Sequence, residues 1–522
     1  MAQETQTPRG RRWPIIALAA AAALSIGAAG VGFAEAQFGG AEDTASAVVG
    51  PNAQRIGTAP QREPAAPREP LQTLDEARAS ADAIDRPLTV VSLTFDDGTD
   101  NQWAAVEALD AIELPGTFYV PSGHIDGQGA LSYEQLVAMQ ASGHEIGGHT
   151  VNHADLAAID SDEAARQICD DRSRLLDWGF DARSFAYPFA RSTPELQRTV
   201  LDCGYESGRM LGALQSPDGC LECAAVEDLQ PAEPANLRAP AQVDSTWTLD
   251  DLQGIVLRAE QTGGWVPITF HNVCDSGCEI NITPKLFAEF AGWLAERQAT
   301  QGTAVLAVGD VIGGETAPAV AGPEDAPTTA EENAIRNPTL EADAAGIPSC
   351  WMTAGYGDSS TVHDTVSPGH SGAAATRVTV EDYRDGDAKW LPSFDLGECS
   401  PAVEAGATYD LGSWYASTGS SQFAVYLRNE LGGWQYWTAS SWFPQSEGYR
   451  QAAWTTPPIP EGYEAISFGL ALIGEGELVT DDVSLTLDRP AGAGGSSERV
   501  EVNSPIEVHG ETESDRADPS QR

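Results

Sequence analysis

The sequence LTFDDGTD, residues 93–100, decides how the first half of this chain is interpreted. It ends an apolar, β-branched run from Leu88 to Phe95, which predicts a buried strand. Two adjacent carboxylates, Asp96 and Asp97, stand where Gly98 breaks that strand. Neighbouring carboxylates usually need a cation or a shared proton, but Asp and Gly are also ordinary turn residues. Taken alone, the stretch therefore fits either a plain turn or a functional site.

Short apolar runs alternate with helical patterns from Leu88 to about Gly314. The expected strands are 88–95, 116–120, 145–147, 184–186, 265–270 and 305–308. The expected helices are 101–111, 132–142, 161–178, 194–203, 248–262 and 284–298. This alternation predicts an α/β fold with a parallel sheet that closes into a distorted (β/α) barrel. Such barrels carry their chemistry at the carboxyl ends of the strands, where Asp96 and Asp97 lie.

The second half of the chain has a different pattern. Short alternating runs with frequent Gly, Ser, Asp and Pro predict an all-β, jelly-roll-like sandwich. We expect six segments in all: a signal peptide or membrane anchor over 1–36, a flexible linker over 37–85, the α/β unit over 86–314, a linker over 315–334, the sandwich over 335–490 and a disordered tail over 491–522.

The N-terminus has the features of an export signal. Arg9, Arg11 and Arg12 precede an apolar run from Trp13 to about Phe33, and Ala34-Glu35-Ala36 offers a cleavage site. The run is long for a signal peptide, so an uncleaved membrane anchor is the alternative. We expect a secreted or extracytoplasmic protein, with attachment to a membrane or cell wall through the N-terminus as the second possibility.

Net charge and cysteine content indicate which partners the protein can bind and which role its cysteines have. The chain has 77 Asp and Glu against 29 Lys and Arg, a net charge of −48, which excludes the basic surface that nucleic acid requires. Eight cysteines in an exported chain predict disulfides. Six lie within 169–278 and two within 350–399, so we expect pairing inside two separate units. A zinc ribbon built from the pairs at 220/223 and 274/278 is the alternative.

A second stretch, GHEIGGHTVNH at residues 143–153, adds histidines to the candidate site. A short strand leads into His149 and His153, whose imidazoles face the same way on a helical turn. With a carboxylate from a strand end, they form a His-His-Asp set that can bind one metal ion. Such a set leaves coordination positions open for water and substrate.

Together, the two stretches resemble the first two motifs of the polysaccharide deacetylase family, also called carbohydrate esterase family four. The motifs are TFDDG at 94–98 and HTVNH at 149–153, and the GHEIG lead-in at 143–147 matches as well. The resemblance covers about residues 88–312, less than half of the chain. It implies the barrel-like fold expected above and the removal of acetyl groups from a polysaccharide.

The resemblance assigns a role to each residue of these motifs. Asp96 corresponds to the general base, and Asp97, His149 and His153 correspond to the ligands of a divalent metal. The expected ion is Zn²⁺, with Co²⁺ or another divalent ion as the alternative. Elementary chemistry agrees, because a metal polarises a water and an acetyl carbonyl while a carboxylate takes the proton of the attacking water.

The third motif resembles SFAYPF at 184–189 but departs from the common pattern. Many members of the family carry an Arg that orients the base where this chain has Ala186. Arg183 and Arg191 are the nearby candidates to replace it. The departure leaves open which residue orients Asp96.

The last motif resembles WVPITFH at 265–271, and it implies that His271 is the general acid. An upstream pair, Asp244 and Trp247, corresponds to residues that accompany this His in the family. Asp244 would hold the tautomer of His271, with plain helix capping as the alternative. We expect four substrate-contacting residues, Pro188, Phe189, Trp247 and Phe270, with the Phe189 N–H as an oxyanion donor.

The sandwich is rich in aromatic residues, most of which we expect in its core. Its ends, NPTLE at 337–341 and TDDVSL at 480–485, resemble the boundaries of carbohydrate-binding modules. Glu341 and Asp481 are the candidate ligands of a structural Ca²⁺ in that unit.

These observations lead to one expected function and two alternatives. We expect an exported, metal-dependent polysaccharide deacetylase that hydrolyses N-acetyl groups of N-acetylglucosamine units in a chitin-like or cell-wall glycan. The first alternative is an O-acetyl esterase of the xylan type, since the chemistry is shared. The second is a catalytically inactive carbohydrate-binding or wall-attached protein, because the usual Arg of the third motif is missing.

Overall fold

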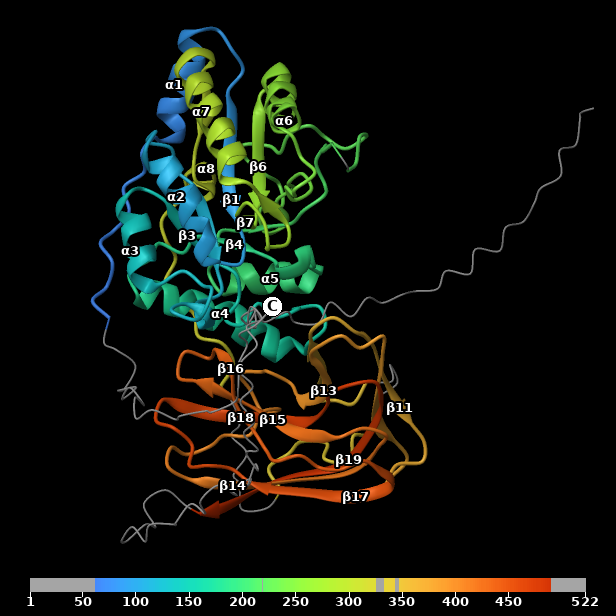
Figure 1. Cartoon of the computed structure of the whole chain (residues 1–522). Helices are drawn as coiled ribbons and strands as arrows, with labels where there is room; N and C mark the ends of the chain where they lie inside the picture. The colour runs from blue at the N-terminus through green and yellow to red at the C-terminus, as the bar shows by residue number, and fades with distance from the viewer. Residues whose placement is uncertain (1–61, 218, 325–332, 343–346, 490–522) are drawn as a thin grey trace, which may run out of the picture.

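The computed structural model describes residues 62–217, 219–324, 333–342 and 347–489. The expected signal peptide or anchor at 1–36 and the expected tail at 491–522 lie outside these residues. An α/β unit is followed by an all-β unit, drawn above and below one another in Figure 1. Within the described part of the chain, each helix is too short or too polar to cross a bilayer.

One parallel sheet organises the α/β unit. Its strands follow the order β5-β4-β3-β2-β1-β6, and β9 pairs with the first half of β1. Their bounds are β1 Thr89–Phe95, β2 Thr117–Val120, β3 Glu145–Gly148, β4 Ser184–Ala186, β5 Ser207–Arg209, β6 Gly264–Phe270 and β9 Thr303–Val305. The loop after β5 fills the space between the two outer strands, β5 and β6. Its residue Leu237 forms a β-bridge with Arg209 on β5, and its residue Glu227 forms one with Trp265 on β6. The curled sheet confirms the predicted distorted barrel.

Strand β1 pairs with three other strands, β2, β6 and β9, and all seven of its residues are buried. A strand that is covered on both faces typically has a continuous apolar sequence, as TVVSLTF has. The covering helices are α2 Trp103–Asp110, α3 Tyr133–Ala141, α4 Ser161–Asp177, α5 Pro194–Asp202, α6 Leu249–Thr262, α7 Pro284–Gln301 and α8 Val308–Ile312. Side chains of Ser132, Asp160 and Thr248 cap α3, α4 and α6 at their N-termini.

Residues 62–85, which the sequence suggested as part of a flexible linker, are instead packed on the α/β unit. Helix α1, Leu74–Ala83, begins with a capping box formed by Thr73 and Glu76. Upstream, the Arg68 guanidinium forms a bidentate ion pair with the carboxylate of Asp310. The second expected linker also docks, since Arg172 on α4 donates hydrogen bonds to the carbonyls of Ala317 and Pro318.

Two antiparallel sheets form the predicted sandwich. One has the order β10-β13-β18-β15-β16 and the other β11-β12-β19-β14-β17. The strands are β10 Trp351–Tyr356, β11 Ser360–Val366, β12 Ala375–Glu381, β13 Asp387–Pro392, β14 Thr408–Ser417, β15 Ser421–Asn429, β16 Trp434–Ala439, β17 Ser446–Thr455, β18 Tyr463–Leu472 and β19 Gly476–Arg489. Tyr415 and Trp434 are buried as expected, whereas Tyr436 and Trp442 are about half exposed.

Four disulfides pair all eight cysteines, and each stays within one unit. The pairs are Cys169–Cys203, Cys220–Cys223, Cys274–Cys278 and Cys350–Cys399. The predicted division between two units is therefore observed. The alternative of a zinc ribbon does not occur, because its four cysteines are bonded to one another.

An aromatic cluster joins the sheet to α7. The ring of Phe287 meets those of Phe95 and Phe270 edge-on, at centroid distances of 5.5 and 5.3 Å. All three side chains are fully buried. Edge-to-face packing of this kind adds to the free energy that burial of the rings contributes.

Phe287→Ala should lower the free energy of unfolding by about 3–5 kcal/mol, because it opens a cavity against the ends of β1 and β6. Leu257→Ala on α6 is the matched control, since Leu257 is 43% exposed and should cost less than about 0.5 kcal/mol. Urea denaturation followed by circular dichroism measures both. Equal losses in the two variants would contradict the packing described.

Candidate metal and catalytic site

Polar side chains gather at the carboxyl edge of the parallel sheet. Asp96 and Asp97 follow β1, His149 follows β3, and His271 follows β6. Side chains in a regular strand alternate between faces, but Asp97 has a φ of 75° and leaves the strand geometry. Both carboxylates therefore turn toward the same edge, where each meets a different set of partners.

Asp97, His149 and His153 form one compact cluster. The Oδ1 atom of Asp97 lies 3.4 Å from His149 Nε2 and 3.2 Å from His153 Nε2. One nitrogen or oxygen of each residue lies within 4.8 Å of the others. In the part of the chain that the structure describes, this is the one cluster of three or more such side chains close enough to share an ion. Two imidazoles and a carboxylate suit a divalent metal with open positions.

The backbone fixes which nitrogen of His149 faces the cluster. His149 Nδ1–H donates to the carbonyl oxygen of Ala186, 2.8 Å away, so Nε2 is the nitrogen that faces Asp97. The ring of His153 packs edge-on against that of Phe189, 4.8 Å between centroids. The segment between the histidines is an irregular turn, since Thr150 has a φ of 68°, and not the helical turn that the i, i+4 spacing suggested.

Proton affinities in the cluster follow from these contacts. Burial raises the pKa of Asp97, but hydrogen bonds from His149 and His153 outweigh it and hold that pKa well below its usual range. Burial lowers the pKa of His149, but the hydrogen bond to Asp97 and the charge of Asp96 together raise it. The carboxylate is therefore ionised at neutral pH, as a metal ligand must be.

Asp96 has a different set of partners. It is 3% exposed, and its carboxylate accepts hydrogen bonds from the guanidinium of Arg209 on both oxygens. His271 Nε2 lies 3.9 Å from Asp96 Oδ2. The two arginines that the sequence suggested lie elsewhere, because Arg183 pairs with Glu206 and Arg191 pairs with Asp155.

Sequence reasoning missed Arg209, and the reason is the strand that carries it. Strand β5 has only three residues, Ser207–Arg209, too few to show a periodic pattern. The guanidinium of Arg209 is almost fully buried over the ring of Tyr119, 5.3 Å from its centroid. The only signal available was an Arg in a short extended stretch that follows the Gly at the end of a helix.

Two further buried side chains hold this edge together, and neither was predicted. The Gln102 amide donates to the backbone carbonyls of Asp96 and His271, the latter at 3.0 Å. The carboxylate of Asp171 on α4 accepts the backbone N–H groups of Ser122 and His149, both at 3.1 Å. These bonds fix the loops that carry the candidate residues.

Some of the predicted site residues make contacts other than the expected ones. Asp244 accepts hydrogen bonds from Thr246, and His271 Nδ1 has no hydrogen-bond partner within the described residues, so Asp244 does not orient His271 here. Trp247 and Phe270 are 4% and 0% exposed and belong to the core. Their expected contact with substrate is not available in this arrangement.

The third motif contributes surface and backbone. Pro188 is buried, whereas Phe189 is 40% exposed and has a φ of 56°. Phe189 therefore remains the part of this motif that can face a ligand, beside His153.

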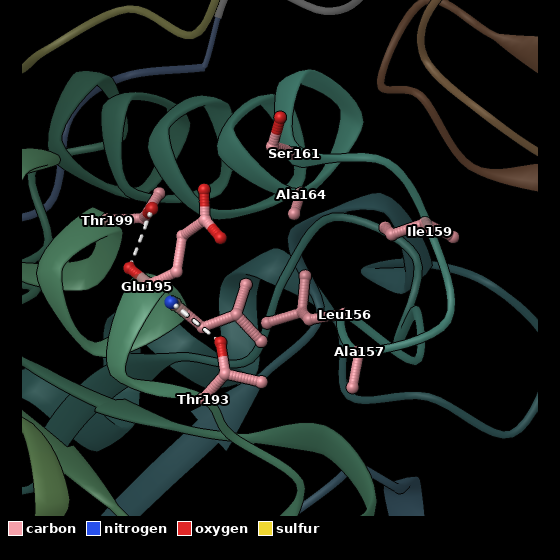
Figure 2. Close-up of a pocket in the computed structure, with 9 residues that line it drawn as sticks. Leu156, Ala157, Ile159, Ser161, Ala164, Thr193, Glu195 and Thr199 are labelled. Atoms are coloured by element: carbon pink, nitrogen blue, oxygen red, sulfur yellow. Dashed lines mark hydrogen bonds between the residues drawn. The ribbon is translucent and has the colours of Figure 1, made fainter.

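A cavity of about 160 Å³ lies between the loop after His153, the start of α4 and α5. Figure 2 shows its lining, which includes Leu156, Ile159, Thr193 and Glu195. Its lining includes neither the candidate metal ligands nor Asp96. The candidate metal ligands and Asp96 therefore lie outside this cavity.

The candidate calcium ligands of the sandwich approach one loop. Glu341 accepts the backbone N–H of Ala373 at 2.7 Å, and Asp481 accepts that of Ser371 at 3.0 Å. Within the described residues, a third carboxylate or His close enough to complete a cation site with them is absent.

Comparison with known proteins identifies relatives of the α/β unit. Residues 84–208 match the family described as polysaccharide deacetylase. Chitooligosaccharide deacetylases of Rhizobium leguminosarum bv. trifolii and Sinorhizobium fredii are 37% and 38% identical over 82 residues, 15% of this chain and 35% of either relative. The chain spans less than half of the length of the curated relatives it matches.

Solved structures match more distantly. A family 4 carbohydrate esterase from Streptomyces lividans in complex with acetate is 16% identical, with a TM-score of 0.28, over 42% of this chain and 91% of that chain. At this identity and TM-score the likeness adds nothing to the architecture described above.

Arg209→Ala should lower the free energy of unfolding by about 3–5 kcal/mol, because it leaves the buried Asp96 carboxylate without its counter-charge. Asp96→Asn combined with Arg209→Met should recover part of that loss. Arg191→Ala is the control, since its exposed pair with Asp155 contributes less than about 1 kcal/mol. Thermal unfolding with a chelator present measures all three, and equal losses for Arg209→Ala and Arg191→Ala would rule out the pairing described.

Proposed function

We propose, because this chain carries a polysaccharide deacetylase domain, that it is an exported, metal-dependent deacetylase of N-acetylglucosamine-containing polysaccharide. The observation that supports this most is the cluster of Asp97, His149 and His153 beside Asp96 and His271. The four disulfides support export, since disulfides persist in oxidising compartments. The proposed catalytic unit extends over 86–314 and the accessory unit over 335–490.

In the proposed reaction, Asp97, His149 and His153 hold the ion, with Zn²⁺ as the expected metal. When bound, the ion supplies a polarised water and a Lewis acid for the acetyl carbonyl. Asp96 takes the proton of the attacking water, and His271 gives a proton to the leaving nitrogen. The amide bond breaks to yield acetate and a free amine on the sugar. The Phe189 N–H is the proposed second donor to the developing oxyanion.

The contact between Arg209 and Asp96 argues against the alternative of a catalytically inactive protein. That alternative rested on the missing Arg of the third motif, whose role is to orient the base. In this chain one guanidinium nitrogen of Arg209, Nη2, contacts both oxygens of Asp96, and we take this charge-assisted contact as the one that orients the carboxylate. The orienting role is therefore carried from β5 in our proposal.

Substitution of the base and of a ligand tests the proposal. Asp96→Asn should lower acetate release from N-acetylated glycans by at least 100-fold, since it removes the general base, while the protein still binds Zn²⁺. His149→Ala should lose the metal and the activity together. His370→Ala in the sandwich is the control and should keep both.

Metal content by mass spectrometry and acetate release over N-acetylated and O-acetylated glycans are the measurements. A purified protein that binds no divalent metal would exclude the proposed chemistry. Release from O-acetyl xylan but not from N-acetylated polymers would instead select the esterase alternative.

The sandwich is proposed as an accessory carbohydrate-binding unit. Tyr436 and Trp442 are 51% and 55% exposed, and exposed aromatic faces are the usual platform for sugar rings. Calcium bound by Glu341 and Asp481 would be a structural addition to this unit.

Trp442→Ala should weaken retention on insoluble polysaccharide at least several-fold, since it removes one such face. The measurement is co-sedimentation of the Asp96→Asn protein, which does not consume the substrate, with chitin, xylan and peptidoglycan. Tyr356→Ala, on the edge strand β10 at the opposite side of the sheet from β16, is the matched control. Retention unchanged by Trp442→Ala would show that this aromatic residue takes no part in binding.

A further inference from the structure

The sandwich contacts the part of the α/β unit that carries the two histidines. Figure 1 shows β16 and its neighbours facing α4. The turn between β15 and β16 reaches Gly123 and Val151, residues that lie far from it in the sequence. A Cβ atom built on Gly433 would lie well under 3.0 Å from the Gly123 carbonyl oxygen, and one built on Gly432 would lie 2.9 Å from Val151 Cγ1. The backbone of this turn is therefore packed directly against both residues.

Gly123 and Val151 belong to two segments that hold each other. The Gly123 N–H donates to the Val151 carbonyl at 2.9 Å, and the Ser122 N–H donates to the Thr150 carbonyl at 3.2 Å. Val151 is flanked by His149 and His153 in the sequence. Because the turn packs against both segments, a shift of the turn would move the backbone between His149 and His153.

The turn between β15 and β16 is held by hydrogen bonds of its own and by an apolar contact. The Asn429 side-chain oxygen accepts the N–H groups of Leu431 and Gly433 at 2.9 and 3.0 Å. The Leu431 side chain packs against the core of the α/β unit. A turn fixed by these contacts can hold the segments that contain Gly123 and Val151 in position.

A second connection runs through α4. The Leu396 N–H, in the segment after β13, donates to Glu163 Oε1 at 3.0 Å. Gln167 Nε2 donates to the same oxygen at 2.9 Å, and Gln167 Oε1 accepts the Asn152 N–H at 3.0 Å. The carbonyl of Gln167 also accepts the Val151 N–H at 3.1 Å. A continuous chain of hydrogen bonds therefore joins the sandwich to the turn between the histidines.

We propose that the sandwich is a positioning element for the metal site, in addition to any binding of glycan. It holds residues 149–153 in place through the Asn429–Gly433 turn and through the Leu396–Glu163–Gln167 chain. Groups outside the ligand set that orient the ligands commonly change metal affinity by about 10–100-fold when they are altered. The assignment of His149 and His153 as ligands rests on the proposed function, but the positioning of their backbone does not.

Gly433→Ala in the full chain tests the proposal, because the added methyl group must displace Gly123. Gly448→Ala is the matched control, since a Cβ there meets nothing within 4 Å in the same sandwich. Leu431→Ala removes side-chain contact without a clash and serves if Gly433→Ala fails to fold.

Amide hydrogen exchange over residues 149–153 is the first measurement, and it requires neither metal nor activity. We expect exchange to rise at least about tenfold in Gly433→Ala and Leu431→Ala but not in Gly448→Ala. Zn²⁺ titration should then show an affinity about tenfold weaker in the first two variants. Exchange over 149–153 that matches the wild type in both variants would overturn the proposal, whatever the metal affinity. A wild type that binds Zn²⁺ but releases no acetate would end the proposed function and leave this inference standing.

Discussion

Parallel pairing of strands is the constraint on which the candidate site depends. In a parallel sheet all strands end at the same edge, so residues far apart in the sequence arrive together. The register pairs Phe95 with Phe270, which makes Asp96 and His271 the next residues on adjacent strands. On the other side of β1, β2 pairs with β3 so that Val120 lies opposite Gly148. His149 therefore leaves the sheet at the same edge as Asp97.

The buried charge at this edge is costly, and the fold supplies the partner that makes it possible. Asp96 and Arg209 are 3% and 1% exposed, and taking two charges out of water costs several kcal/mol per ion before they attract each other. A buried pair of this kind is weak support for stability. Its value lies in geometry, because the Nη2 group of Arg209 contacts both carboxylate oxygens and so restricts the orientation of Asp96.

Side chains of helix α4 form hydrogen bonds with the backbone of the candidate site. Glu163, Gln167 and Asp171 are spaced four residues apart, so they lie along one face of the helix. Asp171 holds the backbone of His149, Gln167 holds that of Asn152, and Glu163 accepts the backbone of Leu396 from the sandwich. One face of α4 thus connects the Asp97–His149–His153 cluster with a unit that the sequence suggested only as an accessory domain.

The sequence by itself predicted the α/β and β-sandwich classes, the resemblance to polysaccharide deacetylases, and Asp96, Asp97, His149, His153 and His271 as the candidate site. It could do so because strand–helix alternation and short motifs are local patterns. Only the tertiary structure decided that Arg209, and neither Arg183 nor Arg191, contacts Asp96. It alone also showed that Asp244 bonds to Thr246, that Trp247 and Phe270 are buried, and that the sandwich contacts Val151. The physical reason is that these facts depend on strand order, on register and on which surfaces meet, and a three-residue strand or a glycine contact leaves no periodic signal in the sequence.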